Sequence, residues 1–121
     1  MVEHDDPGLR LLLDLDGVTF TVDAAGDHMV RFVAKRVPSS PGRPHGLSYS
    51  LTLHDREGVR LVGFDNAHAV PAGKGRGRAV MKDHRHRLET TRPYAYRDAA
   101  ALLSDFWSEV DAVLKERGVL P

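Results

Sequence analysis

Several stretches of the chain alternate between apolar and polar residues, which is the spacing of β-strands with one buried face. Residues 29–37 and 47–53 alternate in this way, and residues 59–64 form a further apolar stretch after an Asp-Arg-Glu-Gly turn at 55–58. We therefore expect a strand at 29–37 and an antiparallel hairpin formed by 47–53 and 59–64. The proline-rich segment 38–44 cannot extend the first of these strands, because proline lacks the N–H that a sheet ladder uses.

The N-terminal part predicts another pair of strands. Residues 9–15 are mostly leucine, Asp16 and Gly17 give a tight-turn signal, and residues 18–22 are β-branched or aromatic. This order predicts a hairpin of two strands, 9–15 and 18–22.

The C-terminal part has a different period. Apolar residues recur there at spacings of three and four, which predicts an amphipathic helix over residues 97–117. Asp98 suits the start of this helix and Gly118 its end. We assign Phe106 and Trp107 in its apolar stripe to the core, because aromatic side chains dominate protein cores.

Together these elements predict a single α+β domain over residues 1–121. It would hold a curved, mostly antiparallel sheet of five or six strands, with one long C-terminal helix packed on one face. Residues 1–8 are expected to be flexible.

The composition narrows the class of protein. The 121 residues include no cysteine, which excludes disulfides, thiolate zinc sites and cysteine nucleophiles. No apolar run approaches the roughly 20 residues that span a bilayer. The acidic stretch at 1–6 is the opposite of the basic leader of a signal peptide. We therefore expect a cytoplasmic protein with no membrane partner.

Charge is unevenly distributed, although the formal net charge is zero. Residues 1–27 hold seven acids and one base, whereas residues 71–92 hold seven bases and two acids. We expect a mobile basic loop at the glycine-rich segment 71–79. Such asymmetry predicts an anionic partner for the basic segment; the alternative is a solvated loop that pairs with the acidic N-terminal part. The candidate nucleic-acid-binding residues are Lys74, Arg76, Arg78, Lys82, Arg85 and Arg87.

Two short polar clusters, at 64–68 and 83–87, flank the basic loop and carry the candidate chemistry. Imidazole changes charge near neutral pH, so histidine is the usual proton-transfer group and also the commonest metal ligand. The candidate catalytic residues in these clusters are Asp65, Asn66, His68, Asp83, His84 and His86.

The strand pattern relates the two clusters in space. Residues 80–88 alternate, which predicts a strand with both histidines of the second cluster on one face and its aspartate and arginines on the other. The first cluster follows the strand at 59–64. If both clusters meet at one edge of a sheet, His68 lies within reach of His84 or His86.

Three interpretations of the clusters stay open at this point. Cleavage of RNA through its 2′-hydroxyl needs a base, an acid and cations, which histidine and arginine supply. A metal site would use the three histidines with Asp65, although the surrounding arginines repel a cation. In the third interpretation Asp65 and Asn66 cap a turn at the strand end, and the histidines are exposed without a role.

The order of these motifs resembles the TumE-like family, small bacterial proteins described as toxins of type II toxin–antitoxin pairs. The resemblance covers roughly residues 30–115. It is carried by Pro-His-Gly-Leu-Ser-Tyr-Ser-Leu at 44–51, Gly-Phe-Asp-Asn-Ala-His at 63–68, Asp-His-Arg-His at 83–86, and the Phe-Trp pair of the C-terminal helix. The motif positions that carry across are Asp65, Asn66, His68, His84 and His86.

The resemblance implies a toxin that a cognate antitoxin of the helix-turn-helix type neutralises. By analogy with other small toxins, the target would be RNA or the translation machinery. We therefore predict a metal-independent endoribonuclease or translation-targeting toxin that uses the His/Asp/Arg cluster without a cofactor; a homodimer is compatible with the sequence. One alternative is a non-enzymatic module that binds RNA or a protein. A second is a divalent-metal enzyme with His68, His84 and His86 as ligands.

Overall fold

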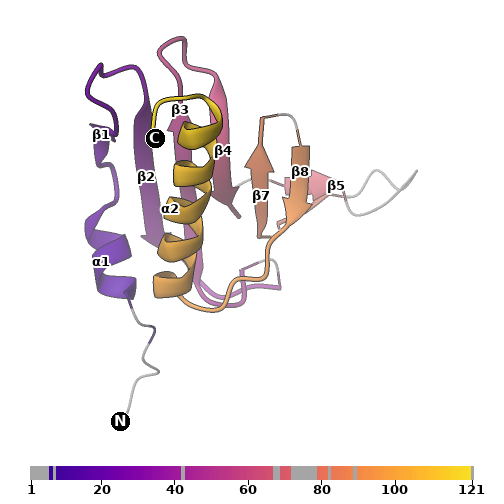
Figure 1. Ribbon diagram of the computed structural model, residues 1–121. Helices are drawn as coiled ribbons and strands as arrows, with labels where there is room; N and C mark the ends of the chain where they lie inside the picture. Colours follow the sequence, from indigo (N-terminus) through magenta and orange to yellow (C-terminus); the bar gives the residue numbers. More distant parts are fainter. Residues whose placement is uncertain are drawn as a thin grey trace.

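The computed structural model describes residues 6, 8–41, 43–66, 69–71, 79–81, 83–88 and 90–120. Within these residues, six strands form one antiparallel sheet in the order β1-β2-β3-β4-β7-β8, and β5 and β6 pair separately (Figure 1). The elements in chain order are α1 (Leu9–Asp14), β1 (Thr19–Thr21), β2 (Met29–Arg36), β3 (Leu47–His54), β4 (Arg60–Asp65), β5 (Ala69–Pro71), β6 (Ala79–Met81), β7 (His84–Arg87), β8 (Thr90–Pro93) and α2 (Ala99–Glu116).

The long helix α2 lies across one face of the sheet, in front of β2, β3 and β4 in Figure 1. Asp98 caps its start, because its carboxylate accepts a hydrogen bond of 2.8 Å from the backbone N–H of Ala101. The apolar stripe of the helix is buried against the sheet, with the ring of Phe106 5.7 Å from that of Phe32 and 6.2 Å from that of Phe64, measured between centroids. The predicted fold class, an α+β sheet with one C-terminal helix on one face, is confirmed.

A β-bulge in β4 decides which side chains lie on the far face of the sheet. Leu53 pairs with Val62, but the next residue of β3, His54, pairs with Arg60. Leu61 is therefore the extra residue of the bulge, and it shares the buried face with Val62. The consequence is that Arg60 lies on the face away from α2.

The prediction of a strand at residues 9–15 is wrong, because this segment forms the short helix α1. The segment contains no β-branched residue, and leucine favours a helix. The helix also buries Leu12 completely in the core shared with α2. Gly8, which precedes it, adopts a positive φ of 82°, and a side chain there would meet the backbone of Ala100 at 3.0 Å.

The strand predicted at 80–88 is divided in the structure between β6 and β7, and β8 was not predicted at all. Residues 72–78 of the predicted mobile loop lie outside the described residues, as do 1–5 and 7 of the segment expected to be flexible. In the part of the chain that the structure describes, neither helix is both long and apolar enough to cross a membrane.

Candidate functional site

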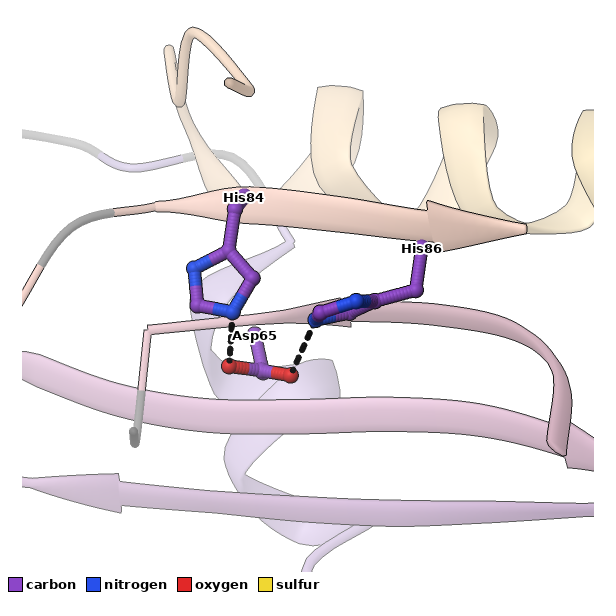
Figure 2. Close-up of side chains that lie close together, drawn as sticks. All are labelled: Asp65, His84 and His86. Carbon is purple, nitrogen blue, oxygen red and sulfur yellow. Dashed lines mark ion pairs between the residues drawn. The ribbon is translucent and has the colours of Figure 1, made fainter. Parts of the chain in front are cut away.

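A single carboxylate holds two imidazoles together on the sheet face away from α2. Asp65 ends β4 and pairs directly with His84, the first residue of β7, while His86 pairs with Gly63. The Nε2 atom of His84 lies 2.9 Å from Oδ1 of Asp65, and the Nε2 atom of His86 lies 3.3 Å from Oδ2. Figure 2 shows both rings reaching down from β7 to the same carboxylate. The two-residue period of β7 therefore brings both histidines to Asp65.

The three side chains are withdrawn from solvent to different degrees. The side chain of Asp65 is 1% exposed, that of His84 is 5% exposed, and that of His86 is 12% exposed. The two imidazoles meet edge to face, with their centroids 4.5 Å apart at an interplanar angle of 84°. His86 is consequently the member of the cluster that a substrate reaches most easily.

Gly63 leaves room for His86 and an arginine to pack against the backbone of β4. A Cβ atom at Gly63 would lie 3.4 Å from Cδ2 of His86 and 3.1 Å from Cδ of Arg60. Because glycine has no side chain, the imidazole and the stem of Arg60 can both lie against the strand here. The bulge in β4 thus places a permanent positive charge beside the histidine cluster.

The surroundings of His86 favour its neutral form. Burial lowers the pKa of His86 below its ordinary value of 6.5, and the positive charge of Arg60 lowers it further, whereas Asp65 acts in the opposite direction. The other ring nitrogen, Nδ1, lies 3.0 Å from the hydroxyl oxygen of Thr91 on the exposed edge strand β8. A ring that directs Nε2–H at Asp65 keeps Nδ1 as a proton acceptor.

Two other predicted catalytic residues lie elsewhere. Asp83 precedes β7, and the hydroxyl of Tyr49 donates a hydrogen bond of 2.7 Å to its Oδ2. Because Tyr49 belongs to the α2 side of the sheet, Asp83 faces away from the two histidines. Asn66 is buried, and its amide group bonds only to the backbone of β3 among the described residues: it accepts from the N–H of Tyr49 at 2.9 Å and donates to the carbonyl of Leu47 at 2.7 Å.

The basic residues predicted from the sequence fall into two groups. Arg85 and Arg87 alternate with the histidines along β7 and so lie on the α2 side. There Arg87 pairs with Glu116, and its Nε lies 3.6 Å from Oε1 of Glu109. His68 and the loop cations lie outside the described residues, so the predicted approach of His68 to His84 or His86 stays a prediction. The loop cations are Lys74, Arg76, Arg78 and Lys82.

The same three side chains offer one ligand atom each to a metal ion. Within the described residues these atoms of Asp65, His84 and His86 all lie within 4.8 Å of one another. Two imidazoles and one carboxylate are a common ligand set for zinc and non-haem iron. The cluster can therefore act chemically in two ways: as a proton-transfer unit, or as a three-ligand metal site.

The family model described as Toxin TumE matches residues 11–114, a range that includes the whole cluster. The chain belongs to the TumE toxin family. This finding confirms the resemblance seen in the motifs and implies a toxin function. No match to the chain was found among curated proteins or among solved structures.

Two residues of the site were not predicted from the sequence of this TumE-family chain. Arg60 lies outside both polar clusters, and Thr91 lies in a strand that was not predicted. A signal for Arg60 was present, since Gly63 within a strand marks a place where another group approaches the backbone closely. The side of β4 on which Arg60 lies depends on the bulge, which no residue pattern predicted.

Proposed function

We propose that this protein is a toxin that cleaves RNA by acid–base catalysis at Asp65, His84 and His86. One observation carries the proposal. The buried carboxylate of Asp65 contacts the imidazoles of His84 and His86 at 2.9 and 3.3 Å, and Arg60, from the same strand as Asp65, lies beside His86. A carboxylate that orients the imidazoles and two histidines that exchange protons are the parts that RNA cleavage needs. The family supports a toxin; the reaction is inferred from the site.

In the proposed reaction His86 is the general base. Its lowered pKa keeps the ring neutral at pH 7, and it is the more exposed of the two imidazoles. It removes the proton of a ribose 2′-hydroxyl, whose oxygen attacks the adjacent phosphorus. The P–O5′ bond breaks, and the departing oxygen takes a proton from His84. The products are a 2′,3′-cyclic phosphate and a 5′-hydroxyl, so no water, metal or cofactor enters the first step.

Asp65 and Arg60 have supporting roles in this reaction. Asp65 fixes the orientation of both rings and stabilises the imidazolium that forms when a ring takes up a proton. Arg60 lies beside His86, where its guanidinium balances the negative charge that develops on the phosphorane. A fixed cation at this position favours a phosphate substrate.

The test is cleavage of a labelled RNA by the purified protein in the presence of EDTA. We expect products that end in a cyclic phosphate, and a loss of about 10²–10⁴-fold in rate for His86→Ala. Exposed His45→Ala is the matched control and should cleave normally. Full activity of His86→Ala would overturn the proposal. A 2′-deoxy substitution at the cleaved position should block the reaction in the unaltered protein.

His68 enters the same experiment as a separate variant. It lies outside the described residues, and its place in the family motif supports a role in proton transfer. We expect His68→Ala to lower the cleavage rate, whereas an unchanged rate would limit the catalytic unit to Asp65, His84 and His86.

We further propose that the toxin is neutralised by a small antitoxin of the helix-turn-helix type, as the toxin family suggests. Expression of the chain alone should arrest bacterial growth, and co-expression of the protein encoded by the neighbouring gene should relieve the arrest. The His86→Ala variant should no longer arrest growth but should still bind the antitoxin, which separates toxicity from partner binding.

A divalent-metal enzyme is the second candidate, favoured by the convergence of three ligand atoms within 4.8 Å. The nearby charge of Arg60 argues against it, because a guanidinium repels a dication. Elemental analysis of the purified protein, before and after addition of zinc, distinguishes the two. Stoichiometric zinc that is lost in Asp65→Asn, together with activity that EDTA abolishes, would establish the metal enzyme.

A further inference from the structure

Two arginines stand directly opposite each other on the α2 side of the β7–β8 hairpin. Arg85 of β7 pairs in register with Arg92 of β8. Directly opposed side chains on one face of a sheet have Cβ atoms only about 4.5–5.5 Å apart, and like charges at such positions are destabilising. The two guanidinium groups repel each other, and an anion bound beside both of them would offset this repulsion.

No carboxylate of the described residues compensates this pair. The nearby acids of α2, Glu109 and Glu116, both contact Arg87 instead. Neither Arg85 nor Arg92 has an ion pair within the described part of the chain. The positive charge of this hairpin face is thus available to a ligand from outside.

The arginine pair also borders the same cavity as the candidate base. A cavity of about 680 Å³ is lined by Arg85 and Arg92 and also by His86 and Arg60. Four arginines and two glutamates line it, so its net charge is positive. The imidazole of His86 and the arginine pair lie on opposite faces of the sheet, so an anionic chain that reaches His86 meets the arginine pair by passing over the edge strand β8.

We propose that Arg85 and Arg92 form a phosphate-binding subsite for the backbone of single-stranded RNA, across the edge strand β8 from the cleaved linkage. This inference rests on the proposed ribonuclease function. Guanidinium groups bind phosphate oxygens in a bidentate manner, and two of them can share one phosphate. The subsite contributes affinity and register and takes no part in proton transfer.

The experiment measures binding of a short, fluorescently labelled 2′-O-methyl RNA by anisotropy over a range of salt concentrations. This probe cannot be cleaved through its 2′ position, so binding is read separately from catalysis. We expect Arg85→Gln combined with Arg92→Gln to weaken binding by about tenfold or more at low salt. The slope of log affinity against log salt should become shallower by about 0.7 for each phosphate that the variant no longer neutralises. Thermal unfolding of each variant checks that it folds.

The matched control is Arg36→Gln, an exposed arginine at the end of β2, which should leave both affinity and slope unchanged. Cleavage by His86→Ala is measured in a separate assay, so a failure of the catalytic proposal can be recognised independently of the binding result. An unchanged salt slope in the double variant would overturn the subsite. Loss of antitoxin binding with unaltered RNA binding would also overturn it, and would assign the arginine pair to an acidic protein partner.

Discussion

Adjacent residues of β7 face opposite sides of the sheet, and the two sides differ in what their charges do. On the α2 side, Arg87 pairs with glutamates of the helix and so ties the hairpin to the rest of the fold. On the other side, His84 and His86 both contact the buried carboxylate of Asp65. One strand of four residues therefore serves both helix docking and the candidate chemistry. Substitutions on the two faces should separate stability from activity.

The comparison extends to two aspartates. Asp83 directly precedes His84 in the chain, and Asp65 pairs with His84 between neighbouring strands. From the sequence, both aspartates are candidates for the same catalytic role. In the structure Asp65 contacts both imidazoles, whereas Asp83 accepts a hydrogen bond from Tyr49 on the opposite side. This difference gives matched variants for testing the two faces.

The largest expected effect is on catalysis at the histidine face. Asp65→Asn keeps the size of the side chain but removes the charge that stabilises an imidazolium. We expect the RNA cleavage rate to fall by about 10²–10⁴-fold, with a change in unfolding free energy of no more than about 2 kcal/mol. Rate measurements beside urea unfolding check both values. A rate within a factor of about two of the unaltered protein would remove Asp65 from the mechanism.

The second prediction concerns the core under α2. Phe106 is fully buried between Phe32 and Phe64, so Phe106→Ala leaves a cavity. We expect the unfolding free energy to fall by about 3–5 kcal/mol. Phe20→Ala is the control, because Phe20 is 40% exposed and should cost less. Equal losses for the two variants would show that the helix is not packed as described.

Much of the fold followed from periodicity. The alternation at 29–37 and 47–53 and the helical stripe of the C-terminal part correspond to β2, β3 and α2. The prediction for the leucine segment at 9–15 was wrong, because a run of leucines is compatible with either a buried strand or a helix. The burial of Leu12 in the core shared with α2 and the close approach of Gly8 to Ala100 are tertiary and cannot be read from the segment itself.

The candidate site was predictable only in part. The period of two along β7 placed His84 and His86 on one face and Asp83 on the other, but nothing in the sequence indicated that Asp65 would contact both imidazoles. Only the register between β4 and β7 brings Asp65, and not Asp83, to the imidazoles. The bulge at Leu61 then adds Arg60, since one extra residue reverses the side on which it lies.

A third prediction tests whether Asp83 contributes to the stability of the fold and not to catalysis. Tyr49→Phe removes a hydroxyl that donates to Asp83 at 2.7 Å, in an environment where burial and the nearby carboxylate raise the pKa of Tyr49. We expect a loss of about 1.5–3 kcal/mol, the usual contribution of a hydrogen bond to a charged group. Asp83→Asn should be milder, and both variants should cleave RNA at nearly the normal rate. A large loss of activity in Asp83→Asn without a loss of stability would return Asp83 to the catalytic unit.

A fourth prediction concerns Gly63, against which His86 and Arg60 pack. Gly63→Ala places a methyl group 3.1 Å from Cδ of Arg60 and 3.4 Å from the ring of His86. The flexible arginine can move aside by a few tenths of an ångström, so we expect little change in stability. Because displacements of about 1 Å can cost about 10²-fold in rate, we expect a smaller loss of roughly tenfold. Thr52→Ala, at the position of β3 that pairs with Gly63, serves as the control and should keep its rate.

The smallest effect is the pH dependence of stability that His86 contributes. Its folded-state pKa lies below 6.5, chiefly because of burial and then because of Arg60, so protons bind more tightly to the unfolded chain. Stability from the neutral ring is therefore present above about pH 6.5 and is lost as the pH falls through the folded value. Urea midpoints between about pH 7 and pH 5 should fall more steeply for the unaltered protein than for His86→Gln. If the attraction of Asp65 outweighed burial, the sign would reverse and His86→Gln would show the steeper fall. The two slopes thus decide whether the histidine face holds its most exposed imidazole as a neutral base.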